Sequence, residues 1–193
     1  MEPPFYDCIE CYWEEQNMIK VGDLVEFKRR GPVSAVLGGL LHLIDRSWDA
    51  WGWHLAVIWE KSDLGDGWYI MEALSGGVET NYYSMEDIRT RCRVYHWLDQ
   101  EPDAKSQSKF LKGHLGKDYD VAVYFWTSLQ YLIRHFINRR IPRLLDERFT
   151  CWELMATWCD FMGKPVHSKY DCPMISDIIK KIQGSRINID AEA

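Results

Sequence analysis

The spacing of hydrophobic and polar positions changes about halfway along the chain. Short apolar runs bounded by turn residues predict five strands, at residues 24–27, 54–59, 68–73, 78–83 and 91–97. Turn residues at 63–67 and 75–77 predict antiparallel neighbours, and Ser84 with Asp87 predicts a capped short helix before the fifth strand. We therefore expect a meander of antiparallel strands.

After Pro102 the apolar positions follow a helical spacing. It predicts helices at 103–115, 121–139, 150–162 and 173–183, in addition to an earlier helix at 33–46 that Gly38 and Gly39 weaken. Gly163 stands where a helix C-cap belongs, and Pro165 prevents continuation. Strands followed by helices predict an α+β domain over 21–183, with an N-terminal extension at 1–20 and a polar, frayed tail at 184–193.

The composition is that of one globular domain. The chain has 193 residues, of which 47% are hydrophobic and 27% charged, enough for a sizeable core. A net charge of −6 argues against a nucleic-acid partner. Ten Trp and ten Tyr predict an aromatic core. The alternative is an aromatic surface that, like the N-terminal extension, contacts a protein partner.

The most apolar segment, at 121–133, contains no formal charge. It is shorter than the roughly 20 residues of a spanning helix, so it predicts a buried helix, with a membrane- or partner-facing helix as the alternative. The N-terminus lacks the basic and apolar regions of a secretory signal. We therefore expect a cytoplasmic or particle-associated protein without an integral membrane segment, whose six cysteines stay reduced.

Cys8 and Cys11 have the CxxC spacing of some zinc sites. A structural zinc ion needs four ligands, and no second pair lies at ligand spacing. We therefore expect two ordinary thiols, no metal and no cofactor.

Cys151 and His54 are the candidates for chemistry. Thr150 can cap the helix that Cys151 opens, which places the thiol among free backbone N–H groups that favour a thiolate and can form an oxyanion hole. His54 begins a strand, and a neutral imidazole beside a thiol can take its proton. The structural alternative is a buried, inert thiol and a core histidine. We expect that alternative for Cys92, Cys159 and the other five histidines.

A catalytic imidazole needs an acceptor that orients its other nitrogen, and Glu72 is the best candidate. It lies within an apolar strand, where a carboxylate is costly unless it is paired. The turn at 63–67 would place that strand beside His54. Glu79 and Glu153 are competitors, but Glu153 lies about 200° around the helix from Cys151.

Five short segments resemble, in their order, the circularly permuted papain-like hydrolases, in particular the YiiX-like branch of the NlpC-type cell-wall peptidase superfamily. They span roughly residues 21–175 and are Val21-Gly-Asp-Leu-Val-Glu-Phe27, His54-Leu-Ala-Val-Ile58, Tyr69-Ile-Met-Glu-Ala73 with Gly77-Val78, Gly116-Lys-Asp-Tyr-Asp120, and Thr150-Cys-Trp-Glu-Leu-Met-Ala156. Two positions depart from the family pattern: Trp152 replaces a small residue, and Thr150 replaces an aromatic one.

The resemblance implies a papain-like α+β fold with Cys151 as nucleophile, His54 as base and Glu72 as orienting acid. It further implies a cysteine hydrolase that cleaves an amide, in a cell-wall peptide, through an acyl-enzyme. A lipid ester or thioester hydrolase, or an acyltransferase, of the same fold is one alternative. A non-enzymatic module of a larger, for example viral, particle is the other.

Overall fold

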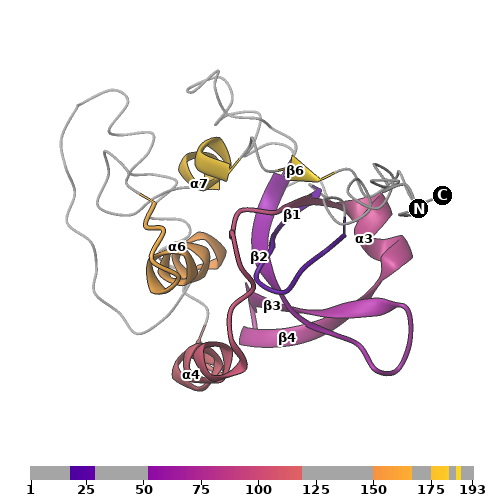
Figure 1. Cartoon of the computed structure of the whole chain (residues 1–193), viewed down its shortest axis with the longest axis horizontal. Coiled ribbons are helices and arrows are strands. Elements are labelled where there is room, and N and C mark those ends of the chain that lie inside the picture. The colour runs from indigo at the N-terminus through magenta and orange to yellow at the C-terminus, as the bar shows by residue number, and fades with distance from the viewer. Residues whose placement is uncertain (1–17, 29–51, 119–149, 167–174, 183–185, 188–193) are drawn as a thin grey trace, which may run out of the picture.

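The protein is an α+β structure built on an antiparallel sheet (Figure 1). The computed structural model describes residues 18–28, 52–118, 150–166, 175–182 and 186–187. Within these ranges the sheet has six strands: β1 (Leu24–Lys28), β2 (Gly52–Lys61), β3 (Gly67–Leu74), β4 (Gly77–Ser84), β5 (Cys92–Tyr95) and β6 (Arg186–Ile187). The helices are α3 (Met85–Arg91), α4 (Ala104–His114), α6 (Cys151–Phe161) and α7 (Ile175–Ile182).

The strand order β4-β3-β2-β1-β5-β6 confirms the predicted meander for the first four strands and corrects it for the fifth. β5 does not follow β4 at the same edge. It pairs with β1, with Phe27 opposite Cys92. The short helix α3, capped by Ser84 as predicted, carries the chain from one side of the sheet to the other. There β5 satisfies the backbone groups along the free side of β1, which would otherwise form an open edge.

The predicted frayed tail is also wrong at two positions. Arg186 and Ile187 pair with Tyr95 and Val94 of β5 and form the last strand of the sheet. Ile187 is buried, and burial of its apolar side chain stabilises this short strand within the polar tail. The helices predicted at 33–46 and 121–139, and the cysteines at 8 and 11, lie outside the described residues.

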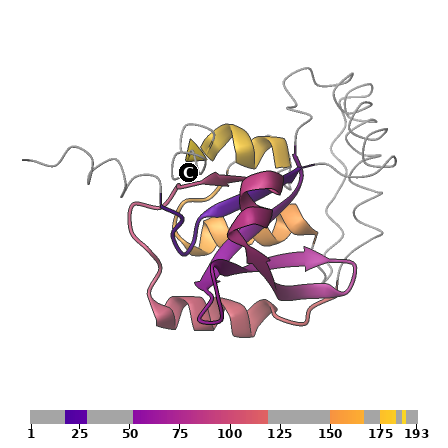
Figure 2. The ribbon, with the colours of Figure 1, turned by 90° about the vertical axis from the view of Figure 1, so that its right-hand side faces the viewer.

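Buried apolar residues cover both faces of the sheet. On one face α6 packs over β2 and β3, α7 packs over β2, and α4 contacts α6, whereas α3 packs on the other side beside β4 and β5 (Figures 1 and 2). Trp158 of α6 is fully buried, with its ring 5.9 Å from that of Trp59 and 4.9 Å from that of Phe110. Aromatic residues thus build part of the core, as the composition predicts. Among the described helices, none has the length and apolar character needed to cross a membrane.

Candidate active site

Cys151 occupies the first position of α6, and its local sequence fixes that helix start. The Thr150 hydroxyl accepts a hydrogen bond from the Glu153 N–H at 3.4 Å, and the Glu153 carboxylate accepts one from the Thr150 N–H at 3.0 Å. This reciprocal capping box satisfies two backbone donors that a helix start leaves open. The other end is a left-handed Gly163, with φ of +73°. Both boundaries were predicted from the sequence.

Strand pairing places the His54 and Glu72 side chains next to each other. β2 pairs with β3 so that Ala56 lies opposite Glu72, and His54, two residues earlier, shares the face of Ala56. The diagonal distance in a sheet is within reach of long side chains. The Nε2 atom of His54 lies 2.8 Å from Oε2 of Glu72, in hydrogen-bonding contact. His54 and Glu72 are therefore neighbours in the sheet, as the sequence predicts.

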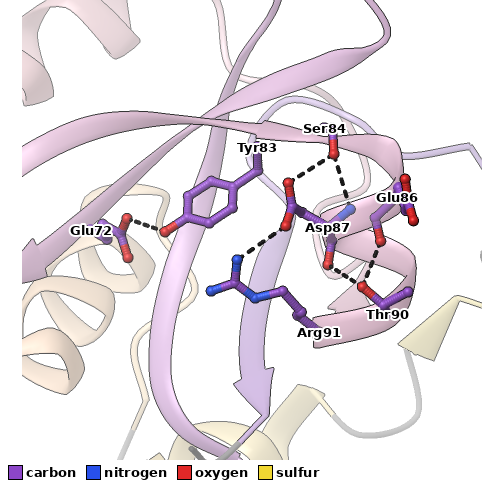
Figure 3. Close-up of polar contacts among 7 residues, drawn as sticks. All are labelled: Glu72, Tyr83, Ser84, Glu86, Asp87, Thr90 and Arg91. Atoms are coloured by element: carbon purple, nitrogen blue, oxygen red, sulfur yellow. Dashed lines mark hydrogen bonds and ion pairs between the residues drawn. The ribbon is translucent and has the colours of Figure 1, made fainter.

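Glu72 is a buried carboxylate whose second oxygen is held by two donors from β4. The Tyr83 hydroxyl donates to Oε1 at 2.8 Å (Figure 3), and the Asn81 amide donates to the same oxygen at 3.1 Å. Only 1% of the Glu72 side chain is exposed. Burial alone raises the pKa of Glu72, but the bonds from His54, Tyr83 and Asn81 outweigh burial and lower the pKa below its usual value. Glu72 is therefore ionised at neutral pH.

Cys151 lies close enough to the His54 ring to influence its protonation. Since Nε2 bonds Glu72, Nδ1 is the ring nitrogen that remains for Cys151. Burial lowers the pKa of His54, whereas its interactions with Cys151, and then those with Glu72, raise it to about 10. A protonated imidazole between a cysteine and a carboxylate is the arrangement that activates a thiol nucleophile.

The candidate nucleophile is covered in this structure. Cys151 is 2% exposed, and the neighbouring Trp152 is 3% exposed within the same buried cluster. The His54 side chain keeps 18% of its surface accessible. Of the Cys151–His54 pair, His54 is therefore the member that a molecule in solvent can contact.

The competing carboxylates have other partners. Glu153 completes the capping box, and Glu79 accepts a hydrogen bond from Asn81 at 3.2 Å. Cys92 and Cys159 are both buried, and burial raises the pKa of Cys159 to about 12, which keeps that thiol protonated. These placements agree with the structural roles expected for them.

Two further histidines have structural contacts. His96 bonds the buried Asp23 through Nδ1 at 2.8 Å, and His114 stacks on Phe110 with the ring centroids 4.2 Å apart. Burial raises the pKa of Asp23 to about 6. An acid–histidine contact therefore occurs twice among the described residues, and Cys151 acts on the His54 member.

The sequence interpretation missed Asn81 and Tyr83. A signal was available, because the turn at Ser75–Gly77 places Glu79 opposite Glu72, and every second residue after Glu79 then faces the Glu72 side of the sheet. These residues are Asn81 and Tyr83, both with a side-chain donor. Phe27, on β1, also packs against the site, with its ring 5.5 Å from that of His54.

Among the residues that the structure describes, no three His, Cys, Asp or Glu side chains gather as metal ligands. A comparison of the sequence with models of protein families gives no match, and a comparison with curated proteins gives none either.

The protonation of His54 can be measured directly. We expect the His54 imidazole, followed by NMR of labelled histidine, to titrate at about 10 in the wild-type protein. In a Cys151→Ala variant the midpoint should fall, because burial then acts against the remaining Glu72 interaction alone. His114, whose pKa is lowered by burial, serves as an internal control that should not change. A His54 midpoint that is the same in both proteins would contradict the thiolate–imidazolium pair.

Proposed function

We propose that the protein is a cysteine hydrolase in which Cys151, His54 and Glu72 act as nucleophile, acid–base and orienting carboxylate. One observation carries the proposal: His54 lies between Cys151 and Glu72, and both partners raise the pKa of its imidazole. A role for Glu72 in stabilising the sheet alone would not explain why Cys151 lies at the other nitrogen of the His54 imidazole.

The arrangement supports acyl transfer in two steps. The Cys151 thiolate attacks the carbonyl carbon of an amide or ester, and the His54 imidazolium donates its Nδ1 proton to the departing nitrogen or oxygen. Neutral His54 then removes a proton from water, which attacks the thioester and regenerates the thiolate. The backbone N–H of Cys151, at the first position of α6, has no acceptor within the helix and can bind the oxyanion.

The resemblance to permuted papain-like hydrolases favours an amide, in a cell-wall peptide, as the substrate. Its support is the matching order of the segments around β1, β2, β3 and α6, together with a helix-start cysteine beside a strand histidine. The fold proposed for the whole domain is accordingly the permuted papain-like one. A lipid ester or thioester would be cleaved by the same groups.

A second candidate function is favoured by the burial of the nucleophile. Because Cys151 is 2% exposed, the same residues could instead stabilise the packing of α6 against the sheet in a non-enzymatic module. In that case no acyl adduct forms, however well the three side chains are aligned.

An acylation experiment separates these candidates. The protein is treated with p-nitrophenyl acetate, a small activated ester, and is then digested and mapped by mass spectrometry. An enzyme should release p-nitrophenol and carry the acetyl group on Cys151. Unmodified Cys151, or acetylation that is no faster there than on other thiols, would leave the non-enzymatic module as the function.

A further inference from the structure

Glu72 accepts hydrogen bonds on both oxygens, and the two oxygens face different parts of the protein. Oε2 meets His54, whereas Oε1 meets the Tyr83 hydroxyl and the Asn81 amide. A carboxylate in a buried strand can rotate about its side-chain bonds, so the donors on Oε1 determine where Oε2 points. The stronger of the two contacts by distance is that of Tyr83, at 2.8 Å.

Two side chains contact the Tyr83 ring. The Phe27 ring, which also packs against His54, lies 5.1 Å from the ring of Tyr83. The guanidinium of Arg91 lies over the phenol, 5.8 Å from its centroid, and such cation–π contacts are attractive. Figure 3 shows Tyr83 reaching from β4 to Glu72, with Arg91 of α3 beside it.

Helix α3 secures Arg91 in turn. The Arg91 guanidinium donates to Asp87 at 3.1 Å, and the Ser84 hydroxyl donates to the other oxygen of Asp87 at 2.8 Å (Figure 3). Burial and the charge of Glu72 raise the pKa of Tyr83 well above its usual value, so the phenol keeps its proton and acts as a donor. The contacts run without a break from the surface helix α3 to the carboxylate at the site.

We propose that Tyr83 is a positioning residue that directs Glu72 towards His54 and so maintains the active arrangement of Cys151. Arg91 and Phe27 fix the Tyr83 ring in the orientation that this requires. The assignment of Glu72 as orienting acid rests on the proposed function, whereas the effect of Tyr83 on the Glu72 carboxylate does not.

The test compares Tyr83→Phe with Tyr82→Phe. Phenylalanine keeps the ring contacts at position 83 and removes only the hydroxyl that bonds Glu72. Tyr82, the neighbouring residue on β4, packs edge-on against Tyr69 and is 47% exposed, so its hydroxyl makes a matched control. Asn81→Ala removes the other donor to Oε1 and serves as a second variant if Tyr83→Phe does not fold.

Two readouts are expected to move together. The pKa of Glu72, followed by carbon NMR of its carboxylate, should rise in Tyr83→Phe because a bond to the charged form is lost. Acylation of Cys151 by p-nitrophenyl acetate should slow by up to roughly tenfold, the change in rate that corresponds to the net contribution of one hydrogen bond. Asn81→Ala should shift both readouts in the same directions, and Tyr82→Phe should leave both at wild-type values.

The outcomes separate this inference from the proposed function. A Glu72 pKa that is unchanged in Tyr83→Phe, or that rises equally in Tyr82→Phe, overturns the role of Tyr83. An acylation rate that is unchanged overturns it as well, because positioning is then without effect on the nucleophile. If the wild-type protein forms no adduct, the proposed function fails, while the Glu72 titration still decides whether Tyr83 controls that carboxylate.

Discussion

Replacing Cys151 by alanine is expected to abolish formation of the acyl adduct with p-nitrophenyl acetate. The variant retains His54 and Glu72 but has no atom that can form the thioester. Its release of p-nitrophenol should equal that of buffer containing an inert protein. Because alanine is smaller and apolar, and Cys151 lies in the core at the start of α6, the substitution should leave the fold intact by circular dichroism.

Cys159→Ala is the matched control for this result. It lies on the same helix, is also fully buried, and has a thiol whose pKa burial raises to about 12. Its removal takes away a sulfur of the same size without removing the proposed nucleophile, so acylation should proceed at the wild-type rate. Equal adduct formation in Cys151→Ala and the wild-type protein would contradict the assignment of the nucleophile.

Replacing His54 by glutamine is expected to slow acylation by about 10²–10⁴-fold at neutral pH, the usual contribution of a positioned acid–base group. Glutamine can still contact Glu72, but it carries no proton in exchange with the thiol and no positive charge beside it. The substitution should lower kcat for the ester more than it raises KM.

The pH dependence of the acylation rate provides a second test of the role of His54. In the wild-type protein the pKa of His54 is raised to about 10, so His54 should stay protonated and the rate should change little across the neutral range. In His54→Gln this acid–base group is lost, so the rate should rise as the hydroxide concentration rises. His114→Gln removes a ring that stacks on Phe110 and bonds its carbonyl oxygen, so it should keep the wild-type profile. A flat profile in His54→Gln would mean that His54 does not control Cys151.

The hairpin that joins His54 to Glu72 could be predicted because its signals are local. The alternating residues of β2 and β3 and the turn between them determine which strands are neighbours. The start of α6 is local in the same sense, since the side chain of Thr150 and that of Glu153 cap the same turn. These segments carry the three residues of the candidate site, His54 on β2, Glu72 on β3 and Cys151 on α6.

The sequence criterion that selects Glu72, a carboxylate within an apolar strand, also selects Glu26. Glu26 also lies in an apolar strand and is 1% exposed, so it meets the criterion that singled out Glu72. In the structure Glu26 accepts a hydrogen bond from Tyr95 at 2.6 Å and lies 3.7 Å from Arg93. Its partners come from β5, which the expected meander had placed elsewhere in the sheet.

The sequence by itself determined the strands of the meander, the capped start of α6 and the helix-start position of Cys151, because periodicity, caps and turns act over a few residues. The tertiary structure decided that β5 lies beside β1, that His54 turns Nε2 to Glu72 and Nδ1 to Cys151, and that Tyr83 and Asn81 hold the carboxylate. These contacts join residues that are distant in the chain, and packing fixes them only once the sheet has formed.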